Sequence, residues 1–358
     1  MAVHFHPLTI KEIKKETADC VTISFDIPQG LKQLFEFSQG QNVTLKTIID
    51  GEETRRSYSI CSAPHENELT VAVKKVSGGK FSCFANEVLK EGMTIDVLSP
   101  TGKFHTELKK ENKKNYVAFA AGSGITPIIS IIKTTLVTEP ESTFTLVYAN
   151  RSRSSIIFFE ELEGIKNKYL QRFQFINILS RERTDADISF GRINTEKLND
   201  LSKLINYHQA DEFFICGPEE MIFCIKDYLL QQGINEKKIH FELFAAVKKS
   251  AINHPQQNKE VNKSAKSFVT IKLDGRSFEF ATGFDNTSIL NAAIKAGADL
   301  PFACKAGVCC TCKAKLVEGK VDMDVHWGLE EEEVKQGYIL TCQSHPVTEK
   351  VVIDFDAR

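Results

Sequence analysis

The sequence predicts a multidomain chain that joins an antiparallel β-barrel, an α/β domain with a parallel sheet, and a small α+β domain. The length of 358 residues exceeds what one hydrophobic core usually organises. The pattern of apolar residues also changes twice along the chain. These changes place the domains at 1–110, 111–246 and 267–358, with a linker at 247–266.

The first segment consists of short alternating apolar and polar runs. Examples are "TISFDI" at 22–27, "NVTLKTII" at 42–49, "LTVAVKKV" at 69–76 and "TIDVLSP" at 94–100. Glycine and proline turn signals separate them. Alternation of this kind is typical of strands with one buried face, so we expect an antiparallel barrel or sandwich over 1–110.

The second segment alternates apolar strands with helical patterns. Strands are expected at "YVAFAAG" (116–122), "FTLVYAN" (144–150) and "EFFICG" (212–217), and a helix at 219–233. Strands that alternate with helices build a parallel sheet with crossover connections.

The last segment follows a polar stretch. Residues 247–266 show no apolar period and predict a flexible linker. "FVTIKLDGRSFEF" then predicts a hairpin over 268–280. "TSILNAAIKAG" predicts a helix with Thr287 as its N-cap and Gly297 just past its end.

Charge and hydropathy exclude several classes of protein. Lys and Arg number 45 against 47 Asp and Glu, a formal net charge of −2, which does not favour binding to nucleic acid or to an anionic membrane. No apolar run approaches the roughly 18 residues of a membrane span, and the N-terminus does not resemble a signal peptide. We therefore expect a cytoplasmic protein, in which thiols are held reduced.

Four cysteines have the spacing of an iron-sulfur site. Cys304, Cys309 and Cys312 form a C-x4-C-x2-C pattern, and Cys342 follows after 29 intervening residues. This is the plant-type 2Fe-2S spacing, whereas structural zinc sites more often show two separated pairs. The adjacent Cys310 is left over, as a buried small residue or as an alternative ligand.

A glycine turn between a strand and a helix indicates a nucleotide site. Gly122 and Gly124 end the strand at 116–122, and the following helix is expected to begin with Thr126 as N-cap and Pro127 at its first position. Free N–H groups at a helix N-terminus favour a pyrophosphate. A simple strand-to-helix connection is the alternative, because Pro127 stands where the third glycine of the dinucleotide fingerprint would fall.

Two arginines follow the next strand of the second domain. Arg151 and Arg153 stand where an acidic residue would otherwise bind the ribose hydroxyl. Arginine there fits a 2′-phosphate and favours NADPH over NADH, although arginines are also common on plain surfaces.

Two motifs in the first domain suggest a flat, phosphorylated cofactor. "RRSYSI" at 55–60 supplies an arginine, an aromatic ring and a hydroxyl, and "GGKFS" at 78–82 supplies a backbone phosphate cradle. Taken singly, the first motif also fits an ordinary strand, and the second also fits an ordinary turn.

Together with "GSGITP", "ICGPEEM" and the cysteine spacing, these motifs resemble the ferredoxin-NADP reductase family. The resemblance covers nearly the whole chain in motif order, and it is to the members that carry a C-terminal plant-type ferredoxin domain. It implies an FAD-binding barrel, an NADP-binding α/β domain and a β-grasp 2Fe-2S domain.

The resemblance also implies roles for individual residues. Arg56 would contact the FAD pyrophosphate, Tyr58 would pack on the isoalloxazine, and Ser59 would lie near flavin N5. The FAD set is Arg56, Ser57, Tyr58, Ser59, Gly79, Lys80, Phe81 and Ser82. The nicotinamide nucleotide set is Gly122, Gly124, Thr126, Cys216, Gly217 and Pro218, with Ser59, Thr126 and Cys216 at the hydride position and Phe244 facing the flavin.

The function implied is electron transfer from NADPH through FAD and the 2Fe-2S cluster to a partner protein, with residues 247–266 as the tether. "GVCCTC" and "GYILTCQSHPVTEKVVIDF" are similar to the reductases of phenylacetyl-CoA epoxidase systems, which implies an oxygenase as acceptor. The alternatives are a general reductase for a hydroxylase, a desaturase or a soluble ferredoxin, and a redox-sensing carrier with little turnover.

Overall fold

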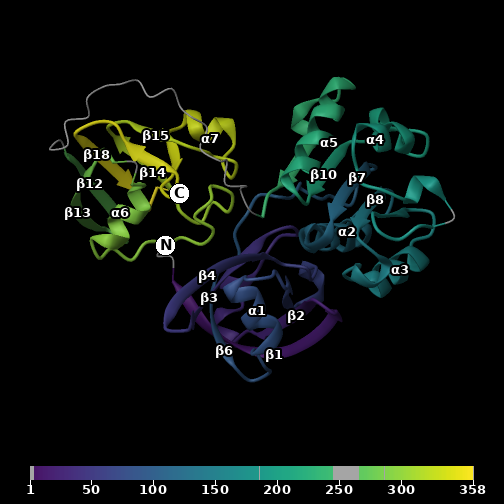
Figure 1. Ribbon diagram of the computed structural model, residues 1–358, viewed down its shortest axis with the longest axis horizontal. Helices are drawn as coiled ribbons and strands as arrows, with labels where there is room; N and C mark the ends of the chain where they lie inside the picture. Colours follow the sequence, from purple (N-terminus) through teal and green to yellow (C-terminus); the bar gives the residue numbers. More distant parts are fainter. Residues whose placement is uncertain (1–3, 185, 245–265, 286, 358) are drawn as a thin grey trace. The chain divides into compact units, whose positions relative to one another are not determined.

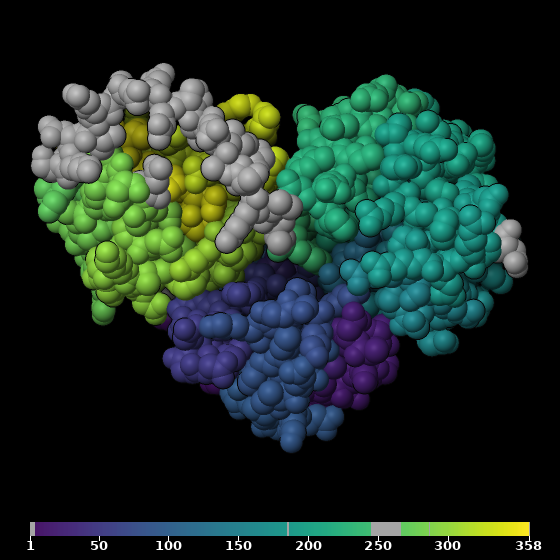
Figure 2. All heavy atoms as spheres, in the orientation of Figure 1, coloured from purple at the N-terminus to yellow at the C-terminus, as the bar shows by residue number. Residues whose placement is uncertain are grey.

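The computed structural model describes residues 4–184, 186–244, 266–285 and 287–357 (Figures 1 and 2). The described residues fall into two units, Phe5–Phe244 and the rest of the chain, and each is considered by itself. The predicted linker 247–266 lies outside the described residues except for Lys266, which begins a strand.

The first unit begins with an antiparallel sheet of the order β4-β3-β6-β1-β2-β5. An additional antiparallel bridge joins Ile60 to Val71, so the two ends of this order meet, as the predicted barrel requires. Its strands are β1 (Phe5–Thr17), β2 (Cys20–Asp26), β3 (Asn42–Ile49), β4 (Glu52–Ser59), β5 (Leu69–Lys74) and β6 (Thr94–Leu98).

The barrel interior is filled by the apolar residues of the alternating runs. Leu8, Ile23, Leu45 and Val71 are fully buried, as period-2 alternation predicts for strands with one buried face. Helix α1 (Lys80–Glu87) lies between β5 and β6 in the chain and adds buried Phe81 to the same core.

The second half of this unit is a parallel sheet of the order β11-β10-β7-β8-β9 (Figure 1). All four neighbouring pairs are parallel, which confirms the predicted α/β class. The strands are β7 (Asn115–Ala121), β8 (Thr143–Asn150), β9 (Phe173–Leu179), β10 (Glu212–Cys216) and β11 (Ile239–Glu242). The helices are α2 (Ile125–Thr138), α3 (Phe159–Lys168), α4 (Thr195–Leu201) and α5 (Glu219–Gln231).

A buried carboxylate joins the connection between the barrel and the sheet to the end of α2. Glu139 has no exposed surface and accepts hydrogen bonds from Tyr116 Oη (2.9 Å), Asn112 Nδ2 (2.6 Å) and Ser142 Oγ (2.7 Å). It also accepts one from the backbone N–H of Lys109 at 3.1 Å. A buried charge persists only with such partners, so Glu139 holds residues 109–112 against the sheet.

The second unit has a five-stranded mixed sheet of the order β13-β12-β18-β14-β16 and a two-stranded sheet β15-β17. A turn at Asp274 and Gly275, both with positive φ, closes the predicted hairpin. The strands are β12 (Lys266–Leu273), β13 (Arg276–Gly283), β14 (Lys313–Glu318), β15 (Val321–Met323), β16 (Tyr338–Leu340), β17 (Ser344–Pro346) and β18 (Lys350–Asp354), and the helices are α6 (Ile289–Lys295) and α7 (Glu331–Lys335).

Two predicted helix caps were wrong by one or two residues. The N-cap of α6 is Ser288, whose Oγ accepts from the N–H of Asn291, and not Thr287. Helix α2 has Gly124 at its N-cap, so Thr126 and Pro127 lie inside its first turn. The glycine turn itself is helical, as the 3₁₀ helix η4 (Gly122–Gly124), and this moves the start of α2 toward the strand.

Among the described residues, no helix has both the length and the apolar character needed to cross a membrane.

Replacing Glu139 with Ala is expected to lower the free energy of unfolding of the reductase by about 3 kcal/mol or more, because each buried donor left unpaired costs about 1–3 kcal/mol. Urea unfolding followed by circular dichroism measures this change. The control is Glu141→Ala, a side chain that is 62% exposed and pairs with Lys113 at 3.8 Å. A loss for Glu139→Ala no larger than that of the control would show that the cluster does not stabilise the fold.

Candidate active site and thiol site

The parallel sheet has its topological switch point between β7 and β10. The chain continues from β7 to β8 on one side of this pair and from β10 to β11 on the other side. Ligands of such sheets bind at the carboxyl ends of the strands at this point. The turn after β7 is η4 and the turn after β10 is Cys216–Pro218, so the structure brings the two predicted nucleotide motifs together.

Glycines allow these two turns to touch through their backbones. A Cβ on Gly124 would collide with the carbonyl oxygen of Cys216, and a Cβ on Gly217 would lie 2.6 Å from Met221 Cε and 3.0 Å from Ala121 Cβ. Both positions therefore require glycine because the two turns approach each other too closely for a Cβ. The adjacent Gly122 adopts φ +52.

A lysine that the sequence reasoning missed lies beside this turn. Lys74 Nζ, at the end of β5 in the barrel, would be 3.9 Å from a Cβ on Gly122. A cation beside backbone N–H groups at a strand-to-helix turn complements an anionic pyrophosphate. Lys74 lies in the run "LTVAVKKV" at 69–76, whose alternation by itself predicts only a strand.

The hydroxyl of Thr126 is occupied within the turn. Its Oγ1 donates to the carbonyl oxygen of Ser123 at 3.0 Å, and the residue is 3% exposed. Thr126 therefore shapes η4 and α2 directly, and its contact with a nicotinamide ring stays a prediction.

Ser59, Cys216 and a carboxylate from the last strand form one group. Ser59 Oγ, from β4, donates to Glu242 Oε2 at 3.2 Å. Glu242 is the register partner of Cys216 in the parallel pair β10–β11. Burial, with a smaller contribution from the Glu242 charge, raises the pKa of Cys216 well above its usual range. Cys216 is thus a neutral thiol beside a carboxylate.

Glu242 was not predicted from the sequence. It lies in "FELF", where only the aromatic Phe244 was singled out. The signal that would identify it is the strand register, because the last residues of adjacent parallel strands share one edge of the sheet. Phe244 ends the described part of the first unit and is 41% exposed, and its contact with flavin stays a prediction.

The alternation of β4 divides the predicted FAD residues between two faces. Arg56 is exposed and Tyr58 half-buried on one face, and Ser57 lies on the other, where its Oγ is 3.1 Å from Thr44 Oγ1. The Tyr58 ring packs on Phe81 with centroids 5.4 Å apart, and burial raises the pKa of Tyr58. An aromatic ring on the same face as an exposed arginine suits a flat heterocycle with a phosphate.

The "GGKFS" motif forms the start of α1. Gly79 is its N-cap, and Ser82 Oγ accepts from the N–H of Val76 at 3.1 Å. The ammonium of Lys80 pairs with Glu52. The Phe81 side chain is buried in the core, so this residue can line a cofactor only through its backbone. The first N–H groups of the helix remain available to an anion.

More charged residues lie at the ends of β8 and β9 than the two arginines predicted from the sequence. Arg151 and Arg153 are exposed, and the N–H of Arg181, which follows β9, donates to the carbonyl oxygen of Arg151 at 2.9 Å. Glu182 accepts from the backbone N–H of Arg153 at 2.8 Å. The adjacent strand thus contributes Arg181 beside the predicted arginines, together with one carboxylate.

The four predicted cluster ligands form two pairs. Cys304 hydrogen-bonds to Cys309, which lowers the pKa of Cys309, and Cys312 hydrogen-bonds to Cys342, which lowers the pKa of Cys342. Among the described residues, no three His, Cys, Asp or Glu side chains converge on one metal-ion position. Two irons can each take two thiolates. The donor set and its pairing therefore fit a 2Fe-2S cluster.

Cys310 is directed elsewhere. It has φ +54, and its Sγ hydrogen-bonds to the carbonyl oxygen of Gly328. This contact favours a role in loop packing over a role as an alternative ligand, and the residue is half-buried, not fully buried.

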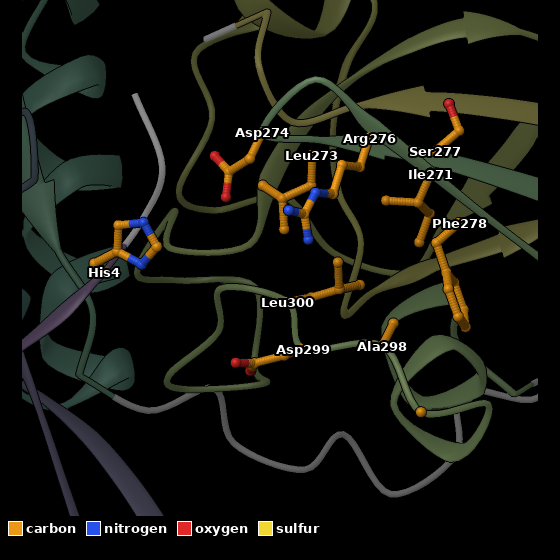
Figure 3. A pocket seen from close by; sticks show the side chains of 11 residues that line it. His4, Ile271, Leu273, Asp274, Arg276, Ser277, Phe278, Ala298, Asp299 and Leu300 are labelled. Carbon is orange, nitrogen blue, oxygen red and sulfur yellow. The ribbon is translucent and has the colours of Figure 1, made fainter.

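The second unit also has a surface hollow of about 580 Å³ (Figure 3). It is lined by His4, Ile271, Leu273, Asp274, Arg276, Ser277, Phe278, Gly297, Ala298, Asp299 and Leu300. None of these described residues belongs to the sites predicted from the sequence.

Three family models match the chain in the order that the motifs predicted. An oxidoreductase FAD-binding domain matches residues 7–106, an oxidoreductase NAD-binding domain matches 119–227, and a 2Fe-2S iron-sulfur cluster binding domain matches 271–347. The chain therefore has the domains for FAD, a nicotinamide cofactor and a 2Fe-2S cluster.

Several curated relatives match the chain over almost its whole length. One subunit of the 1,2-phenylacetyl-CoA epoxidase from Escherichia coli is 46% identical, over 99% of this chain and 98% of that protein. The ferredoxin reductase component of 3-ketosteroid-9-alpha-monooxygenase from Rhodococcus rhodochrous is 31% identical, over 97% and 96%. The reductase of glycine betaine monooxygenase from Pseudomonas aeruginosa is 30% identical, over 98% and 95%.

A solved structure supports the same fold. Phthalate dioxygenase reductase, described as a modular structure for electron transfer from pyridine nucleotides to [2Fe-2S], matches with a TM-score of 0.60 at 24% identity, covering 98% of both chains. With the full-length relatives and the three family models, the chain belongs to the ferredoxin-NADP reductase family, in the group of NAD(P)H oxidoreductases that carry a C-terminal 2Fe-2S domain.

Proposed function

We propose that this chain is the NADPH-dependent reductase component of an oxygenase, and that the oxygenase is a phenylacetyl-CoA epoxidase. The observation that carries the proposal is the full-length similarity to one component of a phenylacetyl-CoA epoxidase, at 46% identity. Other relatives are also reductase components of oxygenases, which supports an oxygenase as the acceptor.

The residues of the switch point serve hydride transfer. When bound, FAD takes electrons in pairs from a nicotinamide and releases them singly to a 2Fe-2S centre. Gly124 and Gly217 keep the two turns in contact, so a nucleotide entering the crevice meets backbone N–H groups with little rearrangement. Cys216 is fully buried and neutral, so it adds no charge beside these turns, and Glu242 accepts a hydrogen bond from the Ser59 hydroxyl.

The two thiol pairs serve single-electron transfer. Cys304 with Cys309 and Cys312 with Cys342 would each hold one iron. The Cys304 Sγ accepts the N–H of Ala306 at 3.3 Å, and N–H groups directed at sulfur stabilise negative charge on a thiolate.

All ten cysteines are free thiols, which supports a reducing compartment, and we place the enzyme in the cytoplasm. The linker 247–266 would then be a tether that lets the 2Fe-2S domain reach both flavin and acceptor.

The function is tested by reconstitution with the oxygenase component of a phenylacetyl-CoA epoxidase. Anaerobic NADPH should bleach the flavin absorbance band, and in air the reductase should support epoxidation of phenylacetyl-CoA. Bleaching with no epoxidation would indicate a general reductase for another acceptor. Failure to bleach with NADPH or NADH would indicate a redox-sensing carrier.

The NADPH preference has a separate test. Catalytic efficiency with NADPH should exceed that with NADH at least about tenfold, because each charge-assisted hydrogen bond to the 2′-phosphate contributes about 1.5–3 kcal/mol. The Arg151→Ala, Arg153→Ala double variant should lose most of this ratio, whereas Lys203→Ala, whose 75% exposed side chain pairs with Asp200, should keep it. Equal efficiencies of the unmodified enzyme with the two nucleotides would reject the preference.

The ligand assignment is tested by a neighbouring pair of cysteines. Cys309→Ala should purify without the visible and EPR signals of the cluster and still reduce ferricyanide with NADPH, since that activity needs only the first unit. Cys310→Ser is the matched control and should keep both signals. Loss of iron from Cys310→Ser, or its retention in Cys309→Ala, would overturn the assignment.

A further inference from the structure

Three contacts hold the glycine turn η4, and one of them comes from a residue outside the predicted sites. The last glycine of the turn lies against the carbonyl group of Cys216. The carbonyl oxygen of Ser123, the middle residue, accepts the Thr126 hydroxyl at 3.0 Å. The carbonyl oxygen of Gly122, the first residue, accepts the hydroxyl of Tyr148 at 2.8 Å. Tyr148 therefore completes the set of contacts that fix this turn.

Tyr148 reaches the turn from within the parallel sheet. It lies on β8, which pairs with β7, and it has no exposed surface. Its ring packs in the same core as the apolar residues of α2, so the phenol has little freedom to leave Gly122. Burial raises the pKa of Tyr148 and outweighs the opposite effect of Asn150 and of the Ile157 backbone. The phenol therefore stays a neutral hydrogen-bond donor.

The turn needs such contacts because of its composition. Gly122 adopts φ +52, and a second glycine follows two residues later. Glycine restricts the backbone less than any other residue, so the turn by itself could adopt many conformations. The free N–H groups at the start of α2 would then point in different directions, and a bound pyrophosphate would have to order them at a cost in affinity.

We propose that Tyr148 is a positioning residue for the nicotinamide nucleotide, and that its phenol fixes η4 in the conformation that binds the pyrophosphate. Tyr148 acts only through the turn, since its side chain is fully buried. Its effect therefore falls on nucleotide affinity and not on the rate of hydride transfer. This inference rests on the proposed reductase function and adds a residue that sets the affinity of the nucleotide site.

The role of Tyr148 differs from that of the two arginines after β8. Arg151 and Arg153 are proposed to select NADPH through its 2′-phosphate, which NADH lacks. The pyrophosphate is common to both nucleotides, so Tyr148 serves NADPH and NADH equally.

The first test removes only the hydroxyl. Tyr148→Phe keeps the ring and its packing. Calorimetric titration of the oxidised, FAD-loaded enzyme should give dissociation constants for NADP+ and NAD+ that are both raised roughly three- to tenfold, the factor that corresponds to one lost hydrogen bond. In a ferricyanide assay the KM for NADPH and the KM for NADH should rise by a similar factor, with kcat within about twofold of that of the unmodified enzyme.

The matched control is Tyr207→Phe. Tyr207 is also buried, at 4% exposed, and its hydroxyl also donates to a backbone carbonyl oxygen, that of Leu198, at 3.1 Å. It precedes β10, so it lies at the amino end of the sheet, away from the turns that follow β7 and β10. This variant undergoes the same chemical change and should leave all of these constants within about twofold.

The second test separates the pyrophosphate from the rest of the nucleotide. Adenosine 2′-monophosphate has no pyrophosphate, so Tyr148→Phe should bind it as tightly as the unmodified enzyme does. Inorganic pyrophosphate, used as an inhibitor competitive with NADPH, should bind Tyr148→Phe more weakly by about the factor found for NADP+.

Three results would overturn the inference. One is a Tyr148→Phe variant whose dissociation constants equal those of Tyr207→Phe. Another is a fall in kcat with an unchanged KM, because the phenol would then affect hydride transfer. The third is an equal loss of affinity for adenosine 2′-monophosphate, which would place the effect on the adenosine side of the site.

Calorimetry separates this inference from the proposed function because it needs neither an oxygenase nor turnover. If the unmodified protein binds NADP+ or NAD+ but does not support epoxidation, the proposed partner is wrong, and the two tyrosine variants still decide the role of Tyr148. If it binds neither nucleotide, the inference is wrong together with the function.

Discussion

The reductase half of the molecule depends on backbone contact between two turns at the switch point of the parallel sheet. Gly124 lies against the carbonyl group of Cys216, and Gly217 lies against Ala121 and Met221. Any side chain at Gly124 or Gly217 would push the turns apart and widen the crevice in which the nucleotide would bind. The helix N-terminus at α2 and the thiol at Cys216 therefore lie in one place because two residues have no Cβ.

The barrel is fixed to this sheet by polar contacts that cross between them. Ser59 of the barrel reaches Glu242 of the last strand, and Ser130 Oγ of α2 donates to the carbonyl oxygen of Ser62 at 2.7 Å. Lys133 Nζ pairs with Glu66 of the barrel (2.8 Å) and Glu161 of α3 (2.9 Å). These contacts keep the flavin motif and the nucleotide motif in one body, which hydride transfer requires because the reacting atoms must be held within contact distance.

The loop of the second unit has a different requirement. It must bring the thiolates close together and still leave space between them. Glycine again permits the necessary backbone path, at Gly307 with φ +74 and at Gly328. Cys310 adopts the left-handed conformation with a side chain, and its thiol contact with Gly328 offsets part of that cost.

The sequence by itself determined the three kinds of domain, their order, the strands of the barrel and the parallel sheet, and the four thiols. Those features depend on local periodicity, turn residues and spacing along the chain, which are visible in one dimension. Only the tertiary structure decided that Glu242 joins Ser59 and Cys216, that Lys74 lies beside Gly122, that Arg181 accompanies Arg151, and that the thiols form pairs. Each of these depends on register between strands or on contact between residues far apart in the chain. Such contacts are set by how the layers pack, and no spacing along the sequence encodes them.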